Sequence, residues 1–379
     1  MKSMSKIDDL IKELCPDGVS VRSLGDLEDS GIIKLGRGMV ISKNDIADNP
    51  GNYPVYSSSA TGLGEFGRYS KYMFDDERIT WSVDGGGRFF HRKAHKYSVT
   101  NVSGWIRVND TNIITKYLYY VLDNLWLTKK FDYVKKAHPS VIRNEYKIPI
   151  PPLEVQKEIV RVLDSFTELE AELEAELEAR KKQYEYYRNT LLTFNERERV
   201  EYVQIGDICN MKRGKRVIKS QLNDAGIYPV YQNSLLPLGF FNEYNCLAGS
   251  VFMISAGAAG KIGFSDVDFW AADDCWIFDC HENLLERFLY HALKNQQNTI
   301  DSGVRRSSIP RLSRIFIENI KIPVPPLEKQ KQIVSILDKF DALVNDISTG
   351  LPAEIEARRK QYEYYRNKLL TFKELECSK

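Results

Sequence analysis

The chain of 379 residues is an internal repeat of two long modules, and this feature constrains its fold more than any other. Residues 147–154, Lys-Ile-Pro-Ile-Pro-Pro-Leu-Glu, return as residues 321–328, Lys-Ile-Pro-Val-Pro-Pro-Leu-Glu. Residues 180–189, Arg-Lys-Lys-Gln-Tyr-Glu-Tyr-Tyr-Arg-Asn, return as residues 358–367 with a single Lys to Arg change. A period this long excludes a solenoid of short repeats and predicts two whole modules related by a pseudo-two-fold axis.

The remaining segments are related more weakly. A Tyr-Pro-Val-Tyr sequence at 53–56 matches another at 228–231, but little of the surrounding sequence is shared. The chain therefore alternates between variable and near-identical segments. We predict a first module over 1–150, a first long helix over 151–197, a second module over 198–325 and a second long helix over 326–379.

The near-identical segments carry the pattern of long helices. Residues 154–194 contain no Gly or Pro, and Pro151 and Pro152 precede them as a helix start signal. Apolar residues alternate in steps of three and four, which is heptad spacing. In the two copies they are Ile159, Val162, Phe166, Leu169 and Leu173, and Ile333, Ile336, Phe340, Leu343 and Ile347.

The second copy has an insertion that contains Gly350 and Pro352, where we expect the helix to kink or restart. The pattern predicts two long antiparallel coiled-coil helices, each a rod of roughly 60 Å. Because both copies lie in one chain, an intramolecular spacer is favoured over an intermolecular zipper, which stays open as the alternative.

The variable segments have the mixed pattern of α+β modules. Short runs of β-branched and aromatic residues alternate with Gly and Asn turns, and helical stretches follow around 115–127 and 284–296. The fold class predicted for the chain is therefore α+β: two globular modules joined and spaced by the long helices.

Basic residues gather inside both modules. Residues 211–219 and 302–314 contain several Lys and Arg and no acid, and a more diluted cluster spans 129–143. Such clusters neutralise phosphates and donate hydrogen bonds to base edges. An ordinary charged surface can explain one such cluster. It is a weaker explanation for clusters that occur at comparable places in both modules. The formal net charge of +1 does not by itself indicate a nucleic-acid binder.

The sequence lacks the motifs of the main catalytic and cofactor-binding classes. It has no Asn-Pro-Pro-aromatic motif of an adenine methyltransferase and no Gly-rich dinucleotide fingerprint. Residues 257–261 resemble a phosphate-binding loop, but Ser255 replaces its first Gly and Ile262 its Ser or Thr. Cys275, Cys280 and His281 lack a second pair to complete a zinc site. We expect a chain without a metal, and the scattered cysteines and absence of an apolar leader favour the cytoplasm.

Two modules separated by helices that open with Ile-Pro-x-Pro-Pro-Leu-Glu and close with Lys-Gln-Tyr-Glu-Tyr-Tyr-Arg resemble the specificity (S) subunits of type I restriction-modification enzymes, the HsdS family. The resemblance covers essentially the whole chain. It implies a non-catalytic subunit in which each module is a target-recognition domain that reads one half of a bipartite site in double-stranded DNA.

The same resemblance implies that the helices set the spacing of the half-sites and dock two methyltransferase subunits, which restriction subunits join. No cofactor is expected on this chain. S-adenosylmethionine, ATP and magnesium are expected on the partner subunits, and no membrane is involved. Two other classes stay open as alternatives: a nuclease or methyltransferase with divergent motifs, and a structural coiled-coil adaptor.

The candidate DNA-binding residues are polar or basic residues of the two modules. In the first module they are Ser57, Ser58, Ser59, Arg88, Lys135, Lys136, His138 and Arg143; in the second they are Lys212, Arg213, Lys215, Arg216, Gln232, Asn233, Lys261, Arg305, Arg306 and Arg311. The candidate docking residues on the helices are Tyr184, Tyr187, Tyr362 and Tyr365. We also predict that residues 5–14 form a short helix that contacts residues 369–375.

Overall fold

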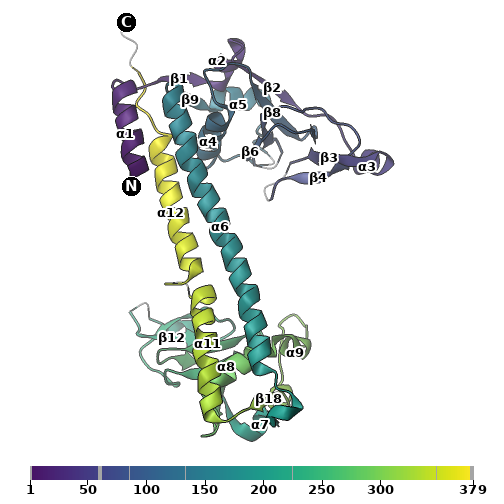
Figure 1. Ribbon diagram of the computed structural model, residues 1–379, viewed down its shortest axis with the longest axis vertical. Helices are drawn as coiled ribbons and strands as arrows, with labels where there is room; N and C mark the ends of the chain where they lie inside the picture. The colour runs from purple at the N-terminus through teal and green to yellow at the C-terminus, as the bar shows by residue number, and fades with distance from the viewer. Residues whose placement is uncertain are drawn as a thin grey trace. The chain divides into compact units, whose positions relative to one another are not determined.

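The computed structural model describes residues 2–58, 62–84, 86–132, 134–223, 225–346 and 348–375, with the side chains of residues 2–5 excepted. The chain divides into two compact units (Figure 1). The first unit comprises Met1–Glu172 and Glu356–Lys379, and the second comprises Leu173–Ile355. The C-terminal segment therefore belongs to the same unit as the N-terminal module.

The first unit contains a four-stranded sheet in the order β2-β8-β5-β6, a three-stranded sheet β4-β3-β7 and a two-stranded sheet β1-β9. Its strands are β1 (Ser20–Ser23), β2 (Ile33–Arg37), β3 (Pro50–Tyr56), β4 (Glu65–Tyr69), β5 (Arg78–Ser82), β6 (Phe89–Arg92), β7 (Ser98–Val99), β8 (Ser103–Val108) and β9 (Lys147–Ile150). Its helices are α1 (Lys2–Leu14), α2 (Leu24–Asp29), α3 (Lys43–Asp48), α4 (Thr115–Trp126) and α5 (Pro139–Glu145), with parts of α6 (Leu153–Leu192) and α12 (Leu351–Leu369).

The second unit repeats this topology, with sheets β11-β17-β14-β15, β13-β12-β16 and β10-β18. Its strands are β10 (Glu201–Gln204), β11 (Cys209–Arg213), β12 (Tyr228–Tyr231), β13 (Gly239–Phe241), β14 (Ser250–Ile254), β15 (Ile262–Ser265), β16 (Trp270–Ala271), β17 (Cys275–Cys280) and β18 (Lys321–Val324). Its helices are η1 (Glu196–Glu198), α7 (Ile205–Ile208), η2 (Lys219–Gln221), α8 (Glu286–Asn295), α9 (Gln297–Ser302), α10 (Arg314–Glu318) and α11 (Leu327–Asn345). The shared strand order confirms the predicted α+β fold and the internal repeat.

A glycine that follows the first strand of the four-stranded sheet explains part of this repeat. The Gly38 N–H donates to the Ser103 oxygen and the Gly214 N–H to the Cys275 oxygen, both at 3.0 Å. A Cβ atom at either position would lie 2.1 Å from a backbone oxygen. This distance is too short for any side chain to be placed there. Both modules therefore carry Arg-Gly here because only glycine permits the close approach of the two backbones.

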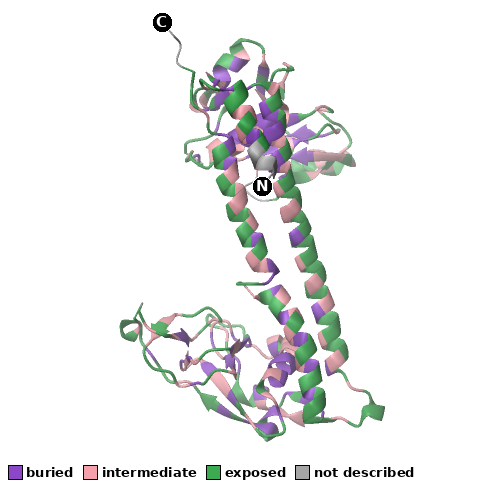
Figure 2. Ribbon diagram, turned by 60° about the vertical axis from the view of Figure 1, so that its left-hand side comes forward, coloured by how far each residue is buried: buried purple, intermediate pink, exposed green. Residues whose placement is uncertain are grey.

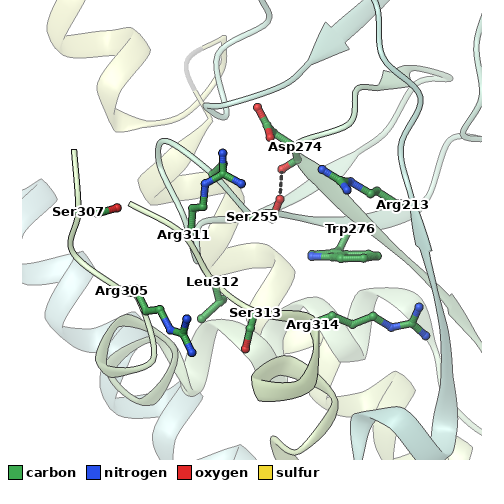
Figure 3. Close-up of a pocket in the computed structure, with 11 residues that line it drawn as sticks. Arg213, Ser255, Asp274, Trp276, Arg305, Ser307, Arg311, Leu312, Ser313 and Arg314 are labelled. Carbon is green, nitrogen blue, oxygen red and sulfur yellow. Dashed lines mark hydrogen bonds between the residues drawn. The ribbon is translucent and has the colours of Figure 1, made fainter. Parts of the chain in front are cut away.

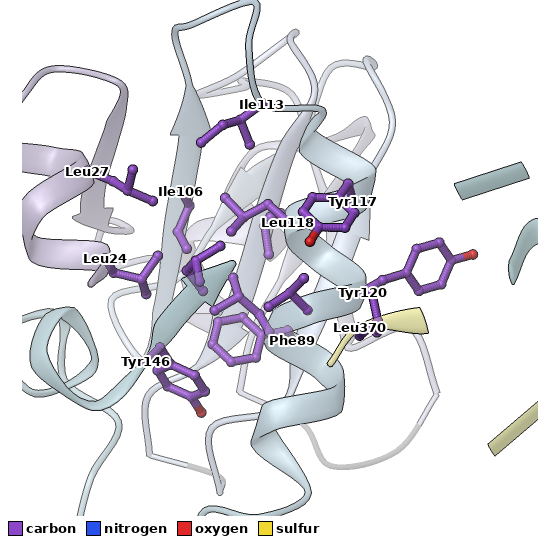
Figure 4. Packing of buried hydrophobic residues seen from close by; sticks show 14 of the residues in the cluster. Leu24, Leu27, Phe89, Ile106, Ile113, Tyr117, Leu118, Tyr120, Tyr146 and Leu370 are labelled. Carbon is purple, nitrogen blue, oxygen red and sulfur yellow. The ribbon is translucent and has the colours of Figure 1, made fainter. Parts of the chain in front are cut away.

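The core of the first unit lies between its four-stranded sheet and α4 (Figure 4). Phe89 and Ile106 from the sheet pack against Leu118 from the helix, and all three are nearly or fully buried. Tyr120 points away from the sheet and donates a hydrogen bond to Asp164 of α6 at 2.5 Å. Helix α4 thus fastens the sheet to the long helix.

The long helices pair within each unit, and their buried residues recur only at intervals (Figure 2). In the first unit Phe166 of α6 stacks on Tyr365 of α12 with ring centroids 5.5 Å apart, and Glu170 pairs with Arg359 at 2.6 Å. As the residue number rises along α6, from Phe166 to Glu170, the number of its partner on α12 falls, from Tyr365 to Arg359. The two helices are therefore antiparallel.

The second copy of the helix is split where Gly350 predicted a restart: α11 ends at Asn345 and α12 begins at Leu351. One position of its predicted seam is wrong. Ile336 is 41% exposed, whereas the following residue, Leu337, is fully buried. The buried residues of α11 still follow steps of three and four, and they are Gln330, Ile333, Leu337, Asp341 and Val344. The seam is displaced by one residue at Leu337 because the buried side of α11 packs into the core of its own module. Ile347 of the predicted seam lies outside the described residues.

The N-terminal helix lies against the C-terminal segment, as predicted (Figure 1). Ile7 is fully buried in the cluster that contains Leu369, and Asp8 pairs with Lys368 at 2.9 Å. The Val19 N–H then donates to the Lys373 oxygen at 2.9 Å. The beginning and end of the described chain are therefore packed together in the first unit.

Each Pro-Pro-Leu-Glu-x-Gln motif ends in a buried glutamine that ties a module to its long helix. Gln156 accepts from the Ile114 N–H at 2.9 Å and donates to the Asn112 and Pro151 oxygens. Gln330 makes the same three contacts in the second unit, with Leu285, Asn283 and Pro325. The amide group is fully satisfied in both places, which explains why the repeat retains it.

Candidate nucleic-acid interface

Four arginines surround an open cavity of about 500 Å³ in the second unit (Figure 3). They come from the end of β11, the loop after α9 and the first turn of α10, and they are Arg213, Arg305, Arg311 and Arg314. Among the described residues that line the cavity, Asp274 is the one carboxylate. The cavity therefore carries an excess of positive charge and suits phosphate oxygens or base-edge acceptors.

Two of these arginines are held by neighbouring residues. Arg213 donates through Nε to the Asp273 oxygen at 2.7 Å. Arg314 pairs with Glu318 at 2.7 Å, and its guanidinium lies 5.5 Å from the Trp276 ring centroid. These contacts fix the position of the side chains while leaving other donor atoms of each guanidinium for a ligand.

The other two arginines are exposed on a closed loop. The Arg305 N–H donates to the Arg311 oxygen at 2.9 Å, and the Arg311 N–H donates back at 3.1 Å. The Leu312 N–H donates to the Ser255 oxygen just after β14, at 2.9 Å. The loop is thereby fixed to the sheet, and the sequence-predicted residues Arg305 and Arg311 are brought beside Arg213.

A basic segment occupies the corresponding place in the first unit. The Ala137 N–H donates to the Val83 oxygen just after β5, at 3.0 Å, as Leu312 does after β14. Lys135 and Lys136, which precede Ala137, are about half exposed, at 52% and 51% of their side chains. They pair with Glu145 and Asp84 at 3.0 and 3.1 Å, respectively. Exposed pairs of this kind are weak, so both lysines can exchange a carboxylate for a phosphate.

His138 and Arg143, which follow this segment, have structural contacts. His138 is the N-cap of α5, where its ring accepts from the Ser140 N–H. Arg143 forms ion pairs with Glu28 at 2.8 Å and Asp29 at 2.7 Å. The hydrogen bond and charge of Asp29 hold the pKa of Arg143 above its ordinary value. Arg143 therefore links α5 to α2, whereas His138 caps α5 itself.

The predicted serines and Arg88 are tied into the first unit as well. The Ser57 hydroxyl lies 2.9 Å from that of Thr100, and the Ser58 hydroxyl contacts that of Ser82. The guanidinium of Arg88 lies 5.3 Å from the Phe90 ring centroid. Ser59 lies outside the described residues. These contacts leave Ser57 and Ser58 half-buried.

The remaining predicted residues of the second module do not line the arginine cavity. Lys212 pairs with Asp279 at 2.7 Å, and Lys261 lies 3.6 Å from Asp301. The Asn233 oxygen accepts from the Ala258 N–H at 2.8 Å. The set outside the lining is Lys212, Lys215, Arg216, Gln232, Asn233, Lys261 and Arg306.

Cys275 and Cys280, two cysteines of the second unit, have raised thiol pKa values. Burial raises the pKa of Cys275 to about 12, and its thiol donates to the Gln232 oxygen at 3.3 Å. The hydrogen bond with Cys209, together with burial, raises the pKa of Cys280, whose Sγ lies 3.6 Å from that of Cys209. Across the described ranges, no three His, Cys, Asp or Glu side chains gather as a metal site.

Comparison with known proteins agrees with this architecture. A family model described as the type I restriction modification DNA specificity domain matches residues 16–179 and 197–357. The chain belongs to this family of type I specificity subunits.

Two curated relatives cover most of the chain. The first is a putative type I restriction enzyme specificity subunit of Haemophilus influenzae, 32% identical over 358 residues, which represent 85% of this chain and 89% of the relative. The second is a type I restriction enzyme specificity subunit of Escherichia coli, 34% identical over 358 residues and 84% of each chain. As a specificity subunit of this family, the chain has two target-recognition domains, which correspond to its two repeated modules.

Solved structures share the fold of the specificity subunit. A crystal structure of the S subunit of a type I restriction-modification system from M. genitalium matches with a TM-score of 0.66, covering 93% of this chain and 96% of that one at 20% identity. A chain from a study of type I complex assembly and conformational transition matches with a TM-score of 0.56 at 16% identity, over 93% and 97% of the two chains. Among the described helices, none is both long and apolar enough to cross a membrane.

The tyrosines predicted for docking in this specificity subunit largely face inward. Tyr184 is buried and donates to Asp341 at 3.3 Å, and Tyr187 stacks on Phe340 at 5.2 Å. In the first unit Tyr362 and Tyr365 pack around Phe166. The most exposed tyrosines of the repeated block are instead Tyr186 and Tyr364, at 65% and 64% exposure, compared with 37% for Tyr187.

Sequence reasoning did not single out some residues that define the cavity. Arg314 lies in the basic cluster over 302–314 but is not among the candidate contacts, and Trp276 belongs to no basic cluster, yet both line the cavity. One feature of the sequence does point to the cavity residue Arg213. The dipeptide Arg37-Gly38 of the first module recurs as Arg213-Gly214 in the second, inside otherwise unlike sequence.

Proposed function

We propose that each target-recognition domain of this specificity subunit reads one half of a bipartite site in double-stranded DNA. The observation that carries the proposal is the placement of a cationic segment at the same point of both modules. Lys135 and Lys136 precede the residue that docks after β5, and Arg305 and Arg311 frame the loop that docks after β14. Unlike sequences with the same charge at the same place are expected of two readers with different targets.

The long helices are proposed to set the distance between the half-sites. Helix α6 contains 40 residues, which span roughly 60 Å at about 1.5 Å per residue. Its first half packs in the first unit and its second half in the second. A helix shared in this way can act as a spacer because its length, and not loop flexibility, then fixes the separation of the two modules.

The closing block of each helix is proposed to dock one methyltransferase subunit. Four of its exposed residues are identical in the two copies: Lys182, Glu185, Tyr186 and Asn189 match Lys360, Glu363, Tyr364 and Asn367. Earlier in α6 the exposed residues are retained only in part. Glu154 and Lys157 match Glu328 and Lys331 of α11, whereas Arg161 and Ser165 are replaced by Ser335 and Lys339. Identical exposed residues in two copies favour two copies of one partner, to which the restriction subunits would be added.

The chemistry is proposed to belong to those partners, with this chain non-catalytic and cytoplasmic. S-adenosylmethionine would bind the methyltransferase subunits, and ATP and magnesium the restriction subunits. The loop over 257–261 supports this proposal because it is an internal turn. Gly260 donates to the Ile254 oxygen and Lys261 to the Ala258 oxygen, so these backbone N–H groups are already used.

The test is to co-express the chain with the methyltransferase encoded beside it and to map N6-methyladenine across the host genome. We expect a bipartite methylated motif with a fixed gap. The variant with Arg305→Ala and Arg311→Ala should keep the complex and lose the motif. A stable complex that methylates no motif would overturn the proposal. Methylation by the purified chain alone would show that it is itself an enzyme.

A further inference from the structure

The loops that carry the cations also hold an aliphatic side chain in solvent. Val134 is 93% exposed in the first module and Ile309 is 53% exposed in the second. Each lies three residues before the residue that docks on the sheet, Ala137 or Leu312. Single exposed aliphatic residues are common on protein surfaces. Here a β-branched one recurs at the same structural position in loops whose sequences differ.

Both loops are built to hold this side chain outward. In the first, the Asp132 carboxylate accepts from the Val134 N–H and the Lys135 N–H, each at 2.7 Å. In the second, the Ser307 hydroxyl donates to the Ile309 oxygen at 2.7 Å, within the turn closed by Arg305 and Arg311. The turns are formed by different contacts but present the same kind of group.

The surroundings indicate what such a group can meet. Lys135 and Lys136 follow Val134, and Arg305 and Arg311 bracket Ile309. We call the exposed side chains of Val134 and Ile309 the aliphatic tips of their loops. A partner that contacts both the cations and an aliphatic tip must offer anionic groups together with a compact apolar group. Double-stranded DNA offers this pair: its backbone is anionic, and the 5-methyl group of thymine is the apolar group displayed in its major groove.

We propose that Val134 and Ile309 each contact the 5-methyl group of a thymine, one in each half-site, while the neighbouring cations bind phosphates. This inference rests on the proposed function and deepens it, because it names a specificity-determining residue and its chemical target in each module. The two tips then discriminate thymine from cytosine by an apolar contact in addition to hydrogen bonds.

The test uses the full chain in complex with its methyltransferase subunit and DNA that contains the mapped motif. Each thymine of the motif is replaced in turn by deoxyuridine, which removes only the methyl group. One position in the half-site read by the second module should bind roughly four-fold more weakly, the factor for one buried methyl group. In the variant Ile309→Ala, thymine and deoxyuridine should bind equally at that position.

Matched controls come from other exposed aliphatic residues. Ile315→Ala should keep the full difference between thymine and deoxyuridine, because Ile315 is 70% exposed but lies on α10 outside the loop. In the first module, Val134→Ala should abolish the difference at one position of the other half-site. Val40→Ala should not, although Val40 is 76% exposed.

Two results would overturn the inference while leaving the proposed function intact. In the first, specific binding is unaffected by deoxyuridine at every position, or the effect persists in Ile309→Ala. In the second, 2-aminopurine placed in the motif brightens on binding and dims in Ile309→Ala, which would make the tip a wedge between bases. If the wild-type complex shows no preference for any motif, the proposed function itself fails.

Discussion

The two units use the same scaffold but different chemistry where each module is fastened to its long helix. In the first unit, Asp164 of α6 pairs with Lys116 at 2.6 Å and accepts from Tyr120 at 2.5 Å. In the second unit the equivalent carboxylate, Asp338 of α11, pairs with Arg287 and His291, both at 2.7 Å.

The difference shows which parts of this junction the repeat fixes. The carboxylate and the buried glutamine are retained in both copies because they lie in the near-identical helices. Their partners on α4 and α8 lie in the variable modules and have changed from lysine and tyrosine to arginine and histidine. A charged or hydrogen-bonding partner is required at each position, but its identity is free as long as the carboxylate is satisfied.

The largest expected effect is a loss of stability on replacing the buried glutamine. It tests whether Gln156 and Gln330 have the same role in their two units. Gln156→Ala should destabilise the first unit, and Gln330→Ala the second, by roughly 3 kcal/mol or more, because each leaves a buried N–H and two buried carbonyls without their partner. Hydrogen exchange of peptides from α4 and α8 in the full chain measures the two effects separately. Gln332→Ala, at an exposed position of α11, is the matched control. If either substitution destabilised both units equally, each glutamine would not act within its own unit, and the comparison of the two junctions would be contradicted.

An intermediate effect is expected at the cationic loops. Arg311→Ala should weaken DNA binding by the complex about ten-fold, within the range of roughly 1–3 kcal/mol for one arginine contact. Lys136→Ala should cost less, because this lysine must first leave Asp84. Binding titrations over a range of salt concentrations should show a shallower salt dependence for both variants. Lys331→Ala, on the exposed side of α11, serves as the control, and an equal loss there would remove the loops from the interface.

The smallest expected effect concerns pH. Burial lowers the pKa of His291, and the charge of Arg287 adds to this, although Asp338 opposes both. The folded second unit therefore keeps His291 neutral below about pH 6.5, where the unfolded chain takes up a proton. The stability of this unit should fall as the pH falls from about 6.5, by at most about 1.4 kcal/mol per pH unit.

The first unit lacks this sensitivity at the equivalent position, because burial raises the pKa of Tyr120 far above neutrality. Hydrogen exchange of α8, corrected for its intrinsic pH dependence, should show a reduced loss of stability between pH 7.5 and 5.5 in His291→Gln. The exposed His281→Gln should behave like the wild-type chain. An unchanged pH dependence in His291→Gln would assign the acid sensitivity to another group.

Much of the architecture could be predicted because the chain contains two copies of one module, which can be compared with each other. The repeated blocks located the long helices, and Gly350 marked the break between α11 and α12. The predicted contact between the N-terminal helix and residues 369–375 is confirmed by Ile7, which is buried in one cluster with Leu369 and Leu370. The seam failed at Ile336 because heptad counting assumes that a helix faces only another helix, whereas α11 also packs against its own module.

The candidate interface was predicted less completely. Charge counting found Arg305, Arg311 and Arg213, which line one cavity, but it could not separate them from Lys212 and Lys261, which pair with acids distant in sequence. For docking it selected Tyr184 and Tyr187 in the first copy of the block, whereas Tyr184 is buried and Tyr186 is the most exposed tyrosine there. Exposure depends on which face of a helix meets its neighbours, and the composition of a segment does not reveal this.

The sequence by itself determined that the chain has two related modules, long helices of heptad character and a break in the second helix. These features follow from local rules, namely periodicity, helix breakers and self-similarity, each of which acts within a few turns of the chain. Only the tertiary structure decided that α12 belongs to the first unit, that Arg213 joins Arg305 and Arg311 around one cavity, and that Val134 and Ile309 occupy equivalent tips. Those facts depend on contacts between residues far apart in the sequence, and close packing, unlike periodicity, leaves no local mark in the order of amino acids.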